Sequence, residues 1–468
     1  MDNQPRERLG SRLGFILLSV GCAVGMGNVW KFPTITGQNG GAFFVLFYLL
    51  FLVLLGVPLM TMEFALGRAA QKSPVRLYHE LTPKGSPFRA HGYAALAGNV
   101  ILMMFYVPVC AWTIVYFFYA LTGRFQSTPM DGFGALFDGM VASPWVLAAV
   151  VLGVTALGFF ICSRSLQGGL ERVTKVMMVA LFVIMIALVI NSFTLDGAKE
   201  GLSFYLLPSI ENFLDPSHNG IIGVITAAMN QAFFTLSIGI GSMAIFGSFI
   251  DKKHALLGES VRVTVLDTCV AVMAGLIIFP ACATFNVEVS AGPPLIFIAL
   301  PSIFHNMWGG QVFGTLFFIF MAFAALSTVF AVFQNILSCV QDLTGWTKGK
   351  ASLICGVAVF LLTLPCVFGG LSGLSLGKLS SVLDVEDYLV SNILLPLGAL
   401  IFTIFCTWKR GWGFENFMTE ANTGTGLKVK RWMYGYMKYV LPVIIFVLFV
   451  LGAVNPFFDL SGWIKSLF

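Results

Sequence analysis

Long apolar stretches alternate with short polar ones along the whole chain. A helix that crosses a bilayer needs about 20 mostly apolar residues, and eleven stretches reach that length. They run approximately over residues 13–36, 41–68, 92–123, 145–163, 170–193, 219–249, 258–285, 310–342, 351–369, 380–408 and 434–455. A twelfth apolar segment, 293–307, is too short to cross and is predicted to form a re-entrant or lid helix. The pattern predicts an all-α polytopic membrane protein.

The first predicted span contains an unusual run, residues 21–33, which reads Gly-Cys-Ala-Val-Gly-Met-Gly-Asn-Val-Trp-Lys-Phe-Pro. A glycine in a helix interior costs about 1 kcal/mol relative to alanine, so three glycines in seven residues predict a break in the helix. The carbonyls freed by a break, together with the Asn28 amide, would form an oxygen-lined site suited to a hard cation. The alternative is close packing of helices through small residues.

A second run of this kind interrupts the sixth predicted span, where residues 237–242 read Ser-Ile-Gly-Ile-Gly-Ser. The two runs occupy matching places if spans one to five recur, inverted, as spans six to ten. Paired broken helices at matching positions predict a transporter whose site lies between the two repeats. We therefore expect a first repeat with an N-terminal latch over 1–193 and an extracellular loop over 194–218. The second repeat would cover 219–410, and 411–468 would hold a cytoplasmic loop, the eleventh span and a short extracellular tail.

Composition and charge support this interpretation. The chain of 468 residues is 57% hydrophobic and 10% charged, with a mean hydropathy of +0.88, which excludes an ordinary soluble protein. If the N-terminus is cytoplasmic, all but five of the 27 Lys and Arg residues fall on the cytoplasmic side, as the positive-inside rule requires. The C-terminus would then be extracellular or periplasmic. The net charge of +5 follows from that rule and does not indicate a nucleic-acid partner.

Several motifs resemble the neurotransmitter:sodium symporter family. They are Ser-Arg-Leu-Gly-Phe at 11–15, the run 21–33, Asn-Gly-Gly at 39–41, Gly-Val-Pro-Leu at 56–59, Met-Glu-Phe-Ala-Leu-Gly-Arg at 62–68, and Phe-Phe-Thr-Leu-Ser at 233–237. The resemblance is strongest to the bacterial amino-acid transporters with eleven spans. It implies the leucine-transporter-type fold, a 5+5 inverted repeat with broken first and sixth helices plus one extra C-terminal span. It also implies a multi-pass protein of the bacterial inner membrane, as a monomer or weak homodimer.

The resemblance further implies two sodium sites and no organic cofactor. The first sodium would be bound by Ala23, Asn28, Thr235 and Asp267, together with the substrate carboxylate. The second would be bound by the carbonyls of Gly21, Val24 and Ala324 and the hydroxyls of Ser327 and Thr328. From the residues alone, the two hydroxyls could instead bond back to their own helix, and Asp267 could pair with Arg262.

Asp267 bears on the role of chloride. In chloride-dependent relatives the matching position is Asn, and a Ser one turn later holds the anion; here that later residue is Ala271. A carboxylate within an apolar span is costly unless it is paired or neutralised. We therefore expect Asp267 to supply the negative charge and transport to be independent of chloride. Tyr48 and Gln231, which resemble chloride-site residues, would be structural remnants.

The substrate class follows from Gly25, because monoamine-type members carry an Asp at this position. Glycine leaves room for the carboxylate of an amino acid, which would meet the Tyr106 hydroxyl, although Tyr106 could also be an ordinary packed aromatic. The implied substrate-binding residues are Ala23, Val24, Gly25, Gly27, Leu102, Tyr106, Phe234, Thr235, Ser237, Ile240, Thr328 and Val332. None of these residues is charged, which favours a hydrophobic L-amino acid, aliphatic or aromatic.

Charged pairs are expected on both sides of this pocket. Lys31 and Asp387 would form the outer gate, and Arg6 and Asp342 the inner one. Glu63 would accept hydrogen bonds from the backbone of the broken sixth span, or would simply be a charge at a helix end. The fifth span has Gly169 but Val179 where many members place a proline ten residues on, so it departs from the spacing that the family associates with unwinding of the inner half of this span.

The resulting prediction is a sodium-coupled symporter that imports an amino acid by alternating access, and not an enzyme. A proton-driven or sodium-independent carrier of the same fold is one alternative. An ion channel or a membrane enzyme is another. The five histidines fall in loops or at span ends, which argues against a catalytic centre at membrane depth.

Overall fold

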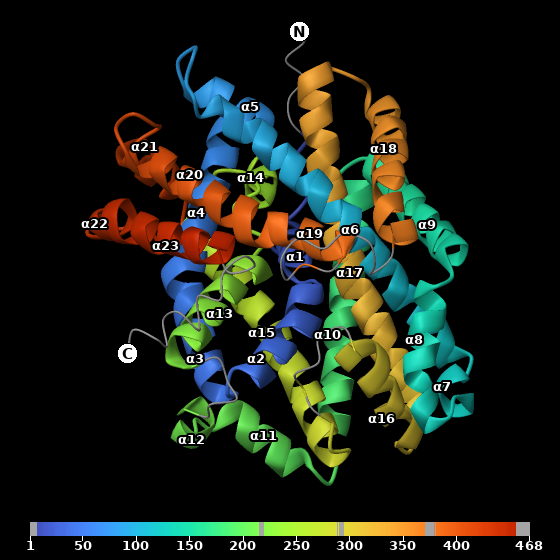
Figure 1. Cartoon of the computed structure of the whole chain (residues 1–468). Helices are drawn as coiled ribbons and strands as arrows, with labels where there is room; N and C mark the ends of the chain where they lie inside the picture. The colour runs from blue at the N-terminus through green and yellow to red at the C-terminus, as the bar shows by residue number, and fades with distance from the viewer. Residues whose placement is uncertain are drawn as a thin grey trace.

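The computed structural model describes residues 7–214, 220–287, 289, 294–369, 379 and 381–454. Within these ranges the chain folds almost entirely into helices, and an isolated β-bridge pairs His254 with Thr425. Figure 1 shows the helices gathered around a central axis on which α1 lies. The predicted all-α fold is confirmed.

The helices of the first predicted repeat come in chain order. They are α1 (Arg12–Ala23), α2 (Phe32–Gln38), α3 (Ala42–Phe51), α4 (Val57–Ala70), α5 (Pro74–Leu81), α6 (Arg89–Leu121), α7 (Arg124–Ser127), α8 (Phe133–Val141), α9 (Pro144–Ser163) and α10 (Arg172–Ser192). Short π-helical turns join several of them, at Gly27–Lys31, Leu52–Gly56 and Gln167–Glu171, and a 3₁₀ turn covers Met130–Gly132.

The remaining helices follow the same pattern. They are α11 (Ala198–Leu206), α12 (Ile210–Leu214), α13 (Gly220–Thr235), α14 (Ser242–Gly247), α15 (Leu256–Thr284), α16 (Leu300–Asn306), α17 (Gly310–Thr344), α18 (Lys348–Gly369), α19 (Val382–Tyr388), α20 (Leu395–Thr407), α21 (Phe414–Ala421), α22 (Met433–Gly435) and α23 (Leu441–Val454). Further π-helical turns lie at Leu295–Ala299, Leu389–Leu394 and Tyr436–Val440.

Most of the predicted spans are continuous. Within the described residues, nine helices are long and apolar enough to cross a membrane, and α1 with the segment Gly27–Gln38 forms a further span that is bent by 57°. The predicted sixth span consists of α13 and α14, which are separated by residues 236–241 and are each too short to cross alone. The predicted lid appears as a short apolar helix, Leu295–Asn306; residue 293, its predicted first residue, lies outside the described part.

Local backbone geometry sets both the start of α1 and the break that follows it. The Ser11 hydroxyl accepts a hydrogen bond from the Gly14 N–H at 3.0 Å and so caps α1, as N-cap serines do. The helix ends at Ala23, because Val24 is extended, with φ −68° and ψ 108°. The chain then resumes a helical course at Gly27. The predicted break is therefore confirmed.

The break in the sixth span has a different cause. Between α13 and α14, residues Ser237, Gly239 and Gly241 all have positive φ, at 51°, 106° and 73°. A Cβ on Gly239 would lie 2.1 Å from the carbonyl oxygen of Leu395, so only glycine fits where the two segments meet. Positive φ is freely available to glycine and strained for most other residues. This turn is why the helix cannot continue.

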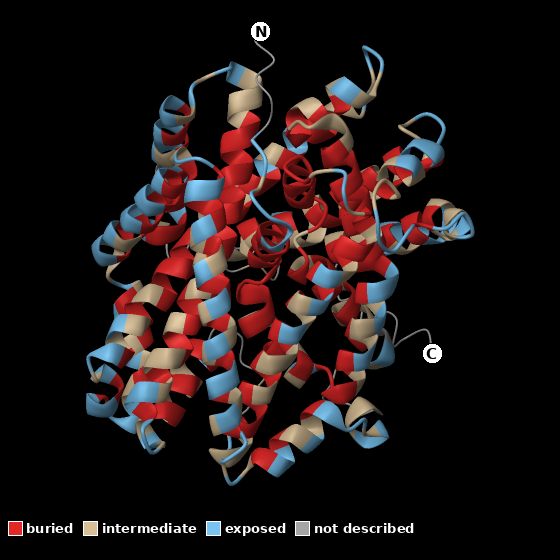
Figure 2. Ribbon diagram, turned by 180° about the vertical axis from the view of Figure 1, so that it is seen from behind, coloured by how far each residue is buried: buried red, intermediate tan, exposed pale blue. Residues whose placement is uncertain are grey.

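Burial separates the central helices from those on the outside. In the most apolar stretch of α17, 78% of the residues are buried, against 33% in the span that ends with α23. Figure 2 shows the same division, with exposed residues on the outward faces of the peripheral helices. In a membrane these apolar outer faces would contact lipid, so the polar chemistry is confined to the centre.

Candidate functional site

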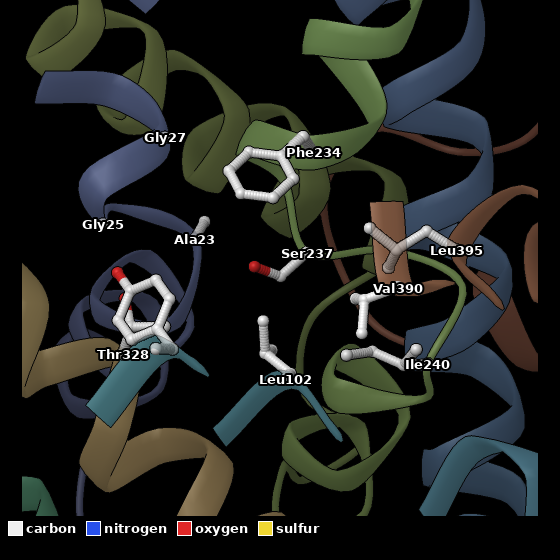
Figure 3. Close-up of a pocket in the computed structure, with 11 residues that line it drawn as sticks. Ala23, Gly25, Gly27, Leu102, Phe234, Ser237, Ile240, Thr328, Val390 and Leu395 are labelled. Atoms are coloured by element: carbon white, nitrogen blue, oxygen red, sulfur yellow. The ribbon is translucent and has the colours of Figure 1, made fainter. Parts of the chain in front are cut away.

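The two broken spans meet at a cavity in the centre of the helical bundle. It is lined by residues from α1, α6, α13, α17, the turn 236–241 and the segment that leads into α20. The lining residues are Ala23, Gly25, Gly27, Leu102, Tyr106, Phe234, Ser237, Ile240, Thr328, Val390 and Leu395. Figure 3 shows Phe234 at one end of the cavity and Leu102 with Ile240 at the other. None of these eleven residues carries a charge.

Nine of the twelve predicted substrate-binding residues line this cavity. The remaining three, Val24, Thr235 and Val332, do not: the first two belong to the oxygen clusters described below, and Val332 is buried in α17. The sequence analysis missed Val390 and Leu395. Both are ordinary apolar residues of the tenth predicted span, and nothing in their local sequence distinguishes them from residues that face lipid.

The two glycines of the first break make the cavity possible. A Cβ on Gly25 would lie 2.4 Å from the Tyr106 hydroxyl and 2.8 Å from Thr328 Oγ1, and one on Gly27 would lie 2.7 Å from the Phe234 ring. Tyr106 is buried, and its hydroxyl accepts a hydrogen bond from the Met26 N–H at 2.9 Å. Tyr106 therefore contacts the break directly and is not merely a packed aromatic.

A first cluster of oxygens lies beside the cavity. Asn28 Nδ2 donates to Asp267 Oδ1 at 2.9 Å, and Thr235 Oγ1 donates to Asp267 Oδ2 at 3.1 Å. All three side chains are at most 1% exposed. The structure thus brings together the three side chains that were predicted to bind the first sodium. The donor set is a carboxylate, an amide and a hydroxyl, all oxygen ligands of the kind that hard cations prefer.

The alternative pairing of Asp267 with Arg262 is wrong. Arg262 Nη1 lies 2.6 Å from Glu259 Oε1 instead, at the beginning of α15. Within the described part of the chain, Asp267 therefore has neutral hydrogen-bond donors and no basic partner. Because a buried carboxylate without a cation is costly, this arrangement favours a bound cation at the cluster.

A second cluster connects α17 to the end of α1. Thr328 Oγ1 lies 3.0 Å from the Val24 carbonyl oxygen and 3.4 Å from those of Gly21 and Ala324. Ser327 Oγ donates to the Ala324 carbonyl at 3.0 Å, so the predicted alternative of bonding back to its own helix holds for Ser327. The five oxygens that were predicted for the second sodium are nevertheless gathered in one place.

Tyr48 and Gln231 lie near the first break, and both are buried. Gln231 Nε2 donates to the Gly27 carbonyl at 2.8 Å, while Gln231 Oε1 and the Tyr48 hydroxyl have no hydrogen-bond partner within the described ranges. Gln231 thus helps to hold the break open. That the two residues are structural remnants of a chloride site stays a prediction.

Glu63 of α4 supports the second break. Its Oε1 accepts a hydrogen bond from the Gly239 N–H at 2.5 Å, and the side chain is 1% exposed. The interpretation of Glu63 as a mere charge at a helix end is therefore wrong. Gly239 lies in the turn between α13 and α14, outside both helices, and the carboxylate supplies an acceptor for its N–H.

The outer gate residues are in contact. Lys31 Nζ lies 3.5 Å from Asp387 Oδ2, with both side chains 33% exposed. The same ammonium lies 3.9 Å from the centre of the Phe234 ring, at the end of the cavity that Phe234 closes (Figure 3). This side of the cavity is therefore covered by an aromatic ring and then by an ion pair.

On the opposite side, the predicted partner Arg6 lies outside the described residues. Asp342 Oδ2 accepts a hydrogen bond from the Ser73 N–H at 2.7 Å, which connects α17 to α5. In the described structure the N-terminal segment is held by other contacts. They are Glu7 with Lys348 at 2.9 Å, the Leu9 N–H with the Phe249 carbonyl at 3.3 Å, the Gly10 N–H with Glu171 at 2.8 Å, and Arg12 with Glu259 at 2.6 Å.

The sequence analysis missed Glu171 and Glu259, both of which are buried. They lie where the fifth and seventh predicted spans begin, and their position beside Arg172 and Arg262 gave no sign that they bind the N-terminal segment. Glu171 also ends the π-helical turn Gln167–Glu171 that contains Gly169, and α10 continues without interruption past Val179.

The ends of two discontinuous helices meet at a central cavity, and oxygen clusters flank this cavity. Such an arrangement defines a class of protein. This is the architecture of secondary transporters that bind substrate and ions where two repeats meet.

Comparison with known proteins identifies the family within that class. The model described as "Sodium:neurotransmitter symporter family" matches residues 6–129 and 137–461. The chain belongs to this family, as the motif resemblance predicted.

Individual relatives point to its bacterial branch. An uncharacterised sodium-dependent transporter, YhdH of Bacillus subtilis strain 168, is 32% identical over 456 residues, which cover 96% of this chain and 98% of the relative. A similar transporter of Haemophilus influenzae is 30% identical over 462 residues, covering 96% of this chain and 98% of the relative. A crystal structure of MhsT in complex with L-phenylalanine is 36% identical, covers 96% of this chain and 100% of that one, and has a TM-score of 0.85.

Proposed function

We propose that this protein is a sodium-coupled symporter that imports hydrophobic L-amino acids, aliphatic or aromatic, by alternating access and without chloride. The observation that carries the proposal is the uncharged cavity at the two helix breaks, with one oxygen cluster that contains a carboxylate directly beside it. Family membership supports sodium coupling, and the L-phenylalanine complex of MhsT supports an amino-acid substrate.

The cavity accounts for substrate choice. An α-amino acid carries a carboxylate and an ammonium, which need polar partners, and a side chain, which needs a matching environment. The Tyr106 hydroxyl and the backbone at Gly25 supply polar groups on one side, and Ser237 supplies another. Much of the remaining wall is apolar and includes Leu102, Phe234, Ile240, Val390 and Leu395. An apolar wall distinguishes a methylene by only about 1–3 kcal/mol, so several hydrophobic amino acids should be accepted.

The two oxygen clusters account for ion coupling. The cluster at Asp267 joins the break in the first span to α13 and α15, and the cluster at Thr328 joins α1 to α17. Each cluster thus connects a broken span to a continuous helix. Cations bound there would hold the breaks in the geometry that receives the substrate. Amino-acid binding should then depend on sodium, because a ligand that orders a site strengthens the binding of the next one.

Asp267 accounts for the proposed independence from chloride. The Asp267 carboxylate already gives the cluster one negative charge. A bound cation adds one positive charge, and the substrate carboxylate adds one negative charge. An additional anion is then unnecessary for charge balance. We further propose a location in the bacterial inner membrane with a cytoplasmic N-terminus, as a monomer or weak homodimer.

Thermal unfolding of the purified protein tests the proposal. Each of the twenty amino acids is added in sodium chloride, sodium gluconate and choline chloride. We expect hydrophobic L-amino acids to raise the melting temperature in both sodium salts and not in choline chloride.

Three results would count against the proposal. Stabilisation that is equal in choline would favour a carrier that works without sodium. Stabilisation that vanishes in gluconate would show a need for chloride. If no amino acid stabilises the protein in sodium, the substrate class is wrong. D-enantiomers of the stabilising amino acids serve as matched controls.

A further inference from the structure

Three buried polar side chains from three different helices meet beside the cavity. They are Asn99 of α6, Ser242 at the start of α14, and Asn335 of α17. Asn335 Nδ2 donates to Ser242 Oγ at 2.7 Å and to Asn99 Oδ1 at 3.0 Å, and Ser242 Oγ lies 3.4 Å from Asn99 Oδ1. All three are at most 1% exposed. None of them was singled out by the sequence analysis.

The position of this cluster relative to the cavity is specific. Asn99 lies three residues before Leu102, and Ser242 lies two residues after Ile240; these two residues line the end of the cavity opposite Phe234 (Figure 3). Asn99 Nδ2 also donates to the Ile240 carbonyl at 2.9 Å. The cluster therefore lies just beyond the cavity, on the side away from the Lys31–Asp387 pair.

The direction of α17 shows which face of the molecule this is. Asn335 lies seven residues after Thr328, which corresponds to about 10 Å along the helix axis, towards the end of α17 at Thr344. The connection from that end leads to α18, whose Lys348 contacts Glu7 of the N-terminal segment. The cluster thus separates the cavity from the face that holds the N-terminal segment.

The chemistry of the cluster suits a contact that forms and breaks. All of its groups are uncharged. A hydrogen bond between uncharged groups shifts the equilibrium between joined and separated helices only a few-fold, unlike a buried ion pair. Asn335 Oδ1 has no partner within the described residues, so one acceptor of the cluster lacks a hydrogen bond while the three helices are packed together. Amides and a hydroxyl can also be hydrated once the helices separate, which apolar side chains cannot.

We propose that Asn99, Ser242 and Asn335 form a neutral inner gate, which closes the cavity on the side of the N-terminal segment. The gate holds the second half of the broken sixth span, α14, against the continuous helices α6 and α17. It separates when the cavity opens to that side, and its polar groups then line the exit route. The inference rests on the proposed function, because it assigns the gate to the inward-opening step of alternating access.

A native cysteine reports on the gate without any need for substrate. Cys22 is buried near the end of α1, and α1 packs against α14, which begins at Ser242. All nine cysteines lie within the described ranges, and Cys269 alone is exposed, so a Cys269→Ser background removes the reactive competitor. Opening of the gate should then expose Cys22 to a maleimide, and mass spectrometry of the Cys22 peptide measures the rate of modification.

The test compares three variants in that background. Asn335→Leu removes both hydrogen bonds that Asn335 donates across helices, and Ser242→Ala removes one partner with a minimal change of volume. Gln334→Leu is the matched control, because the Gln334 amide is also buried in α17 but, among the described residues, donates only to Ser338 of the same helix. In the absence of sodium we expect Cys22 to react about five- to tenfold faster in Asn335→Leu and Ser242→Ala, and at the parental rate in Gln334→Leu.

The outcomes separate this inference from the proposed function. The inference is overturned if Cys22 reacts at the parental rate in both gate variants, or if Gln334→Leu accelerates it equally. Should Asn335→Leu fail to fold, Ser242→Ala decides alone. Sodium-dependent stabilisation by amino acids tests the proposed function separately, because it is measured on the parental protein and does not involve the gate residues.

Discussion

At the scale of single residues, the space around Gly25 decides what this site can bind. A Cβ at this position would lie 2.4 Å from the Tyr106 hydroxyl and 2.8 Å from Thr328 Oγ1. Tyr106 would have to move, which would break the hydrogen bond that its hydroxyl accepts from the Met26 N–H. The missing side chain therefore supports both the cavity and the second oxygen cluster.

Gly25→Ala should weaken amino-acid binding about 30- to 1,000-fold. Overpacking costs about 1–3 kcal/mol, and the lost hydrogen bond adds about 1 kcal/mol. Sodium-dependent binding of a stabilising amino acid, measured by scintillation proximity, provides the test. Gly153→Ala in α9 is the control, because a Cβ there meets nothing within 4 Å. Unchanged affinity in Gly25→Ala would show that Tyr106 and Thr328 can move aside freely.

At the scale of elements, the sixth predicted span depends on residues from other helices to remain broken. The Gly239 N–H donates to Glu63 of α4, and Gly239 packs against the Leu395 carbonyl. In the apolar interior an unpaired backbone N–H is costly. The break is therefore a joint property of α4, α20 and the turn between α13 and α14.

Glu63→Leu should lower the stability of the folded protein by about 1–3 kcal/mol, because it leaves the Gly239 N–H without an acceptor. Glu63→Gln keeps an acceptor oxygen at nearly the same place and should be less destabilised. Thermal unfolding in sodium ranks the three proteins, with the wild type expected first and Glu63→Leu last. A melting temperature of Glu63→Leu at or above that of Glu63→Gln would contradict this role of the carboxylate.

At the scale of the whole molecule, the two sides of the cavity are closed by different means. The outer side has a partly exposed ion pair over an aromatic ring. The inner side has buried carboxylates that bind the N-terminal segment and the neutral cluster of Asn99, Ser242 and Asn335. Exposed ion pairs contribute about 0–1 kcal/mol, so the outer closure should be easily reversed.

Lys31→Gln should weaken amino-acid binding about 3- to 30-fold, since it removes both the ion pair and the cation–π contact with Phe234. Asp387→Asn removes only the ion pair and should weaken binding less than about fivefold. Equilibrium binding to both variants in the same sodium concentration gives the comparison. An equal loss in the two variants would mean that the contact between Lys31 and Phe234 contributes nothing.

Much of the architecture could be predicted from the sequence, because its causes are local. Apolar length indicates where helices cross a membrane, and glycines at 25, 27, 239 and 241 indicate where they break. The motif resemblance then supplied Asn28, Thr235 and Asp267, which the structure brings within hydrogen-bonding distance of one another. Most of the residues predicted for the pocket line the cavity, and most of them lie in or beside those motifs.

By itself, the sequence determined the helical class, the order of the spans, the two breaks and the family, since each depends on residues close together in the chain. Only the tertiary structure decided that Val390 and Leu395 line the cavity, that Glu171 and Glu259 bind the N-terminal segment, and that Asn99 meets Asn335. The physical reason is that side-chain contacts between distant helices depend on how each helix is rotated and how deep it lies. Packing of the whole bundle sets both, and no local pattern in an apolar span records them.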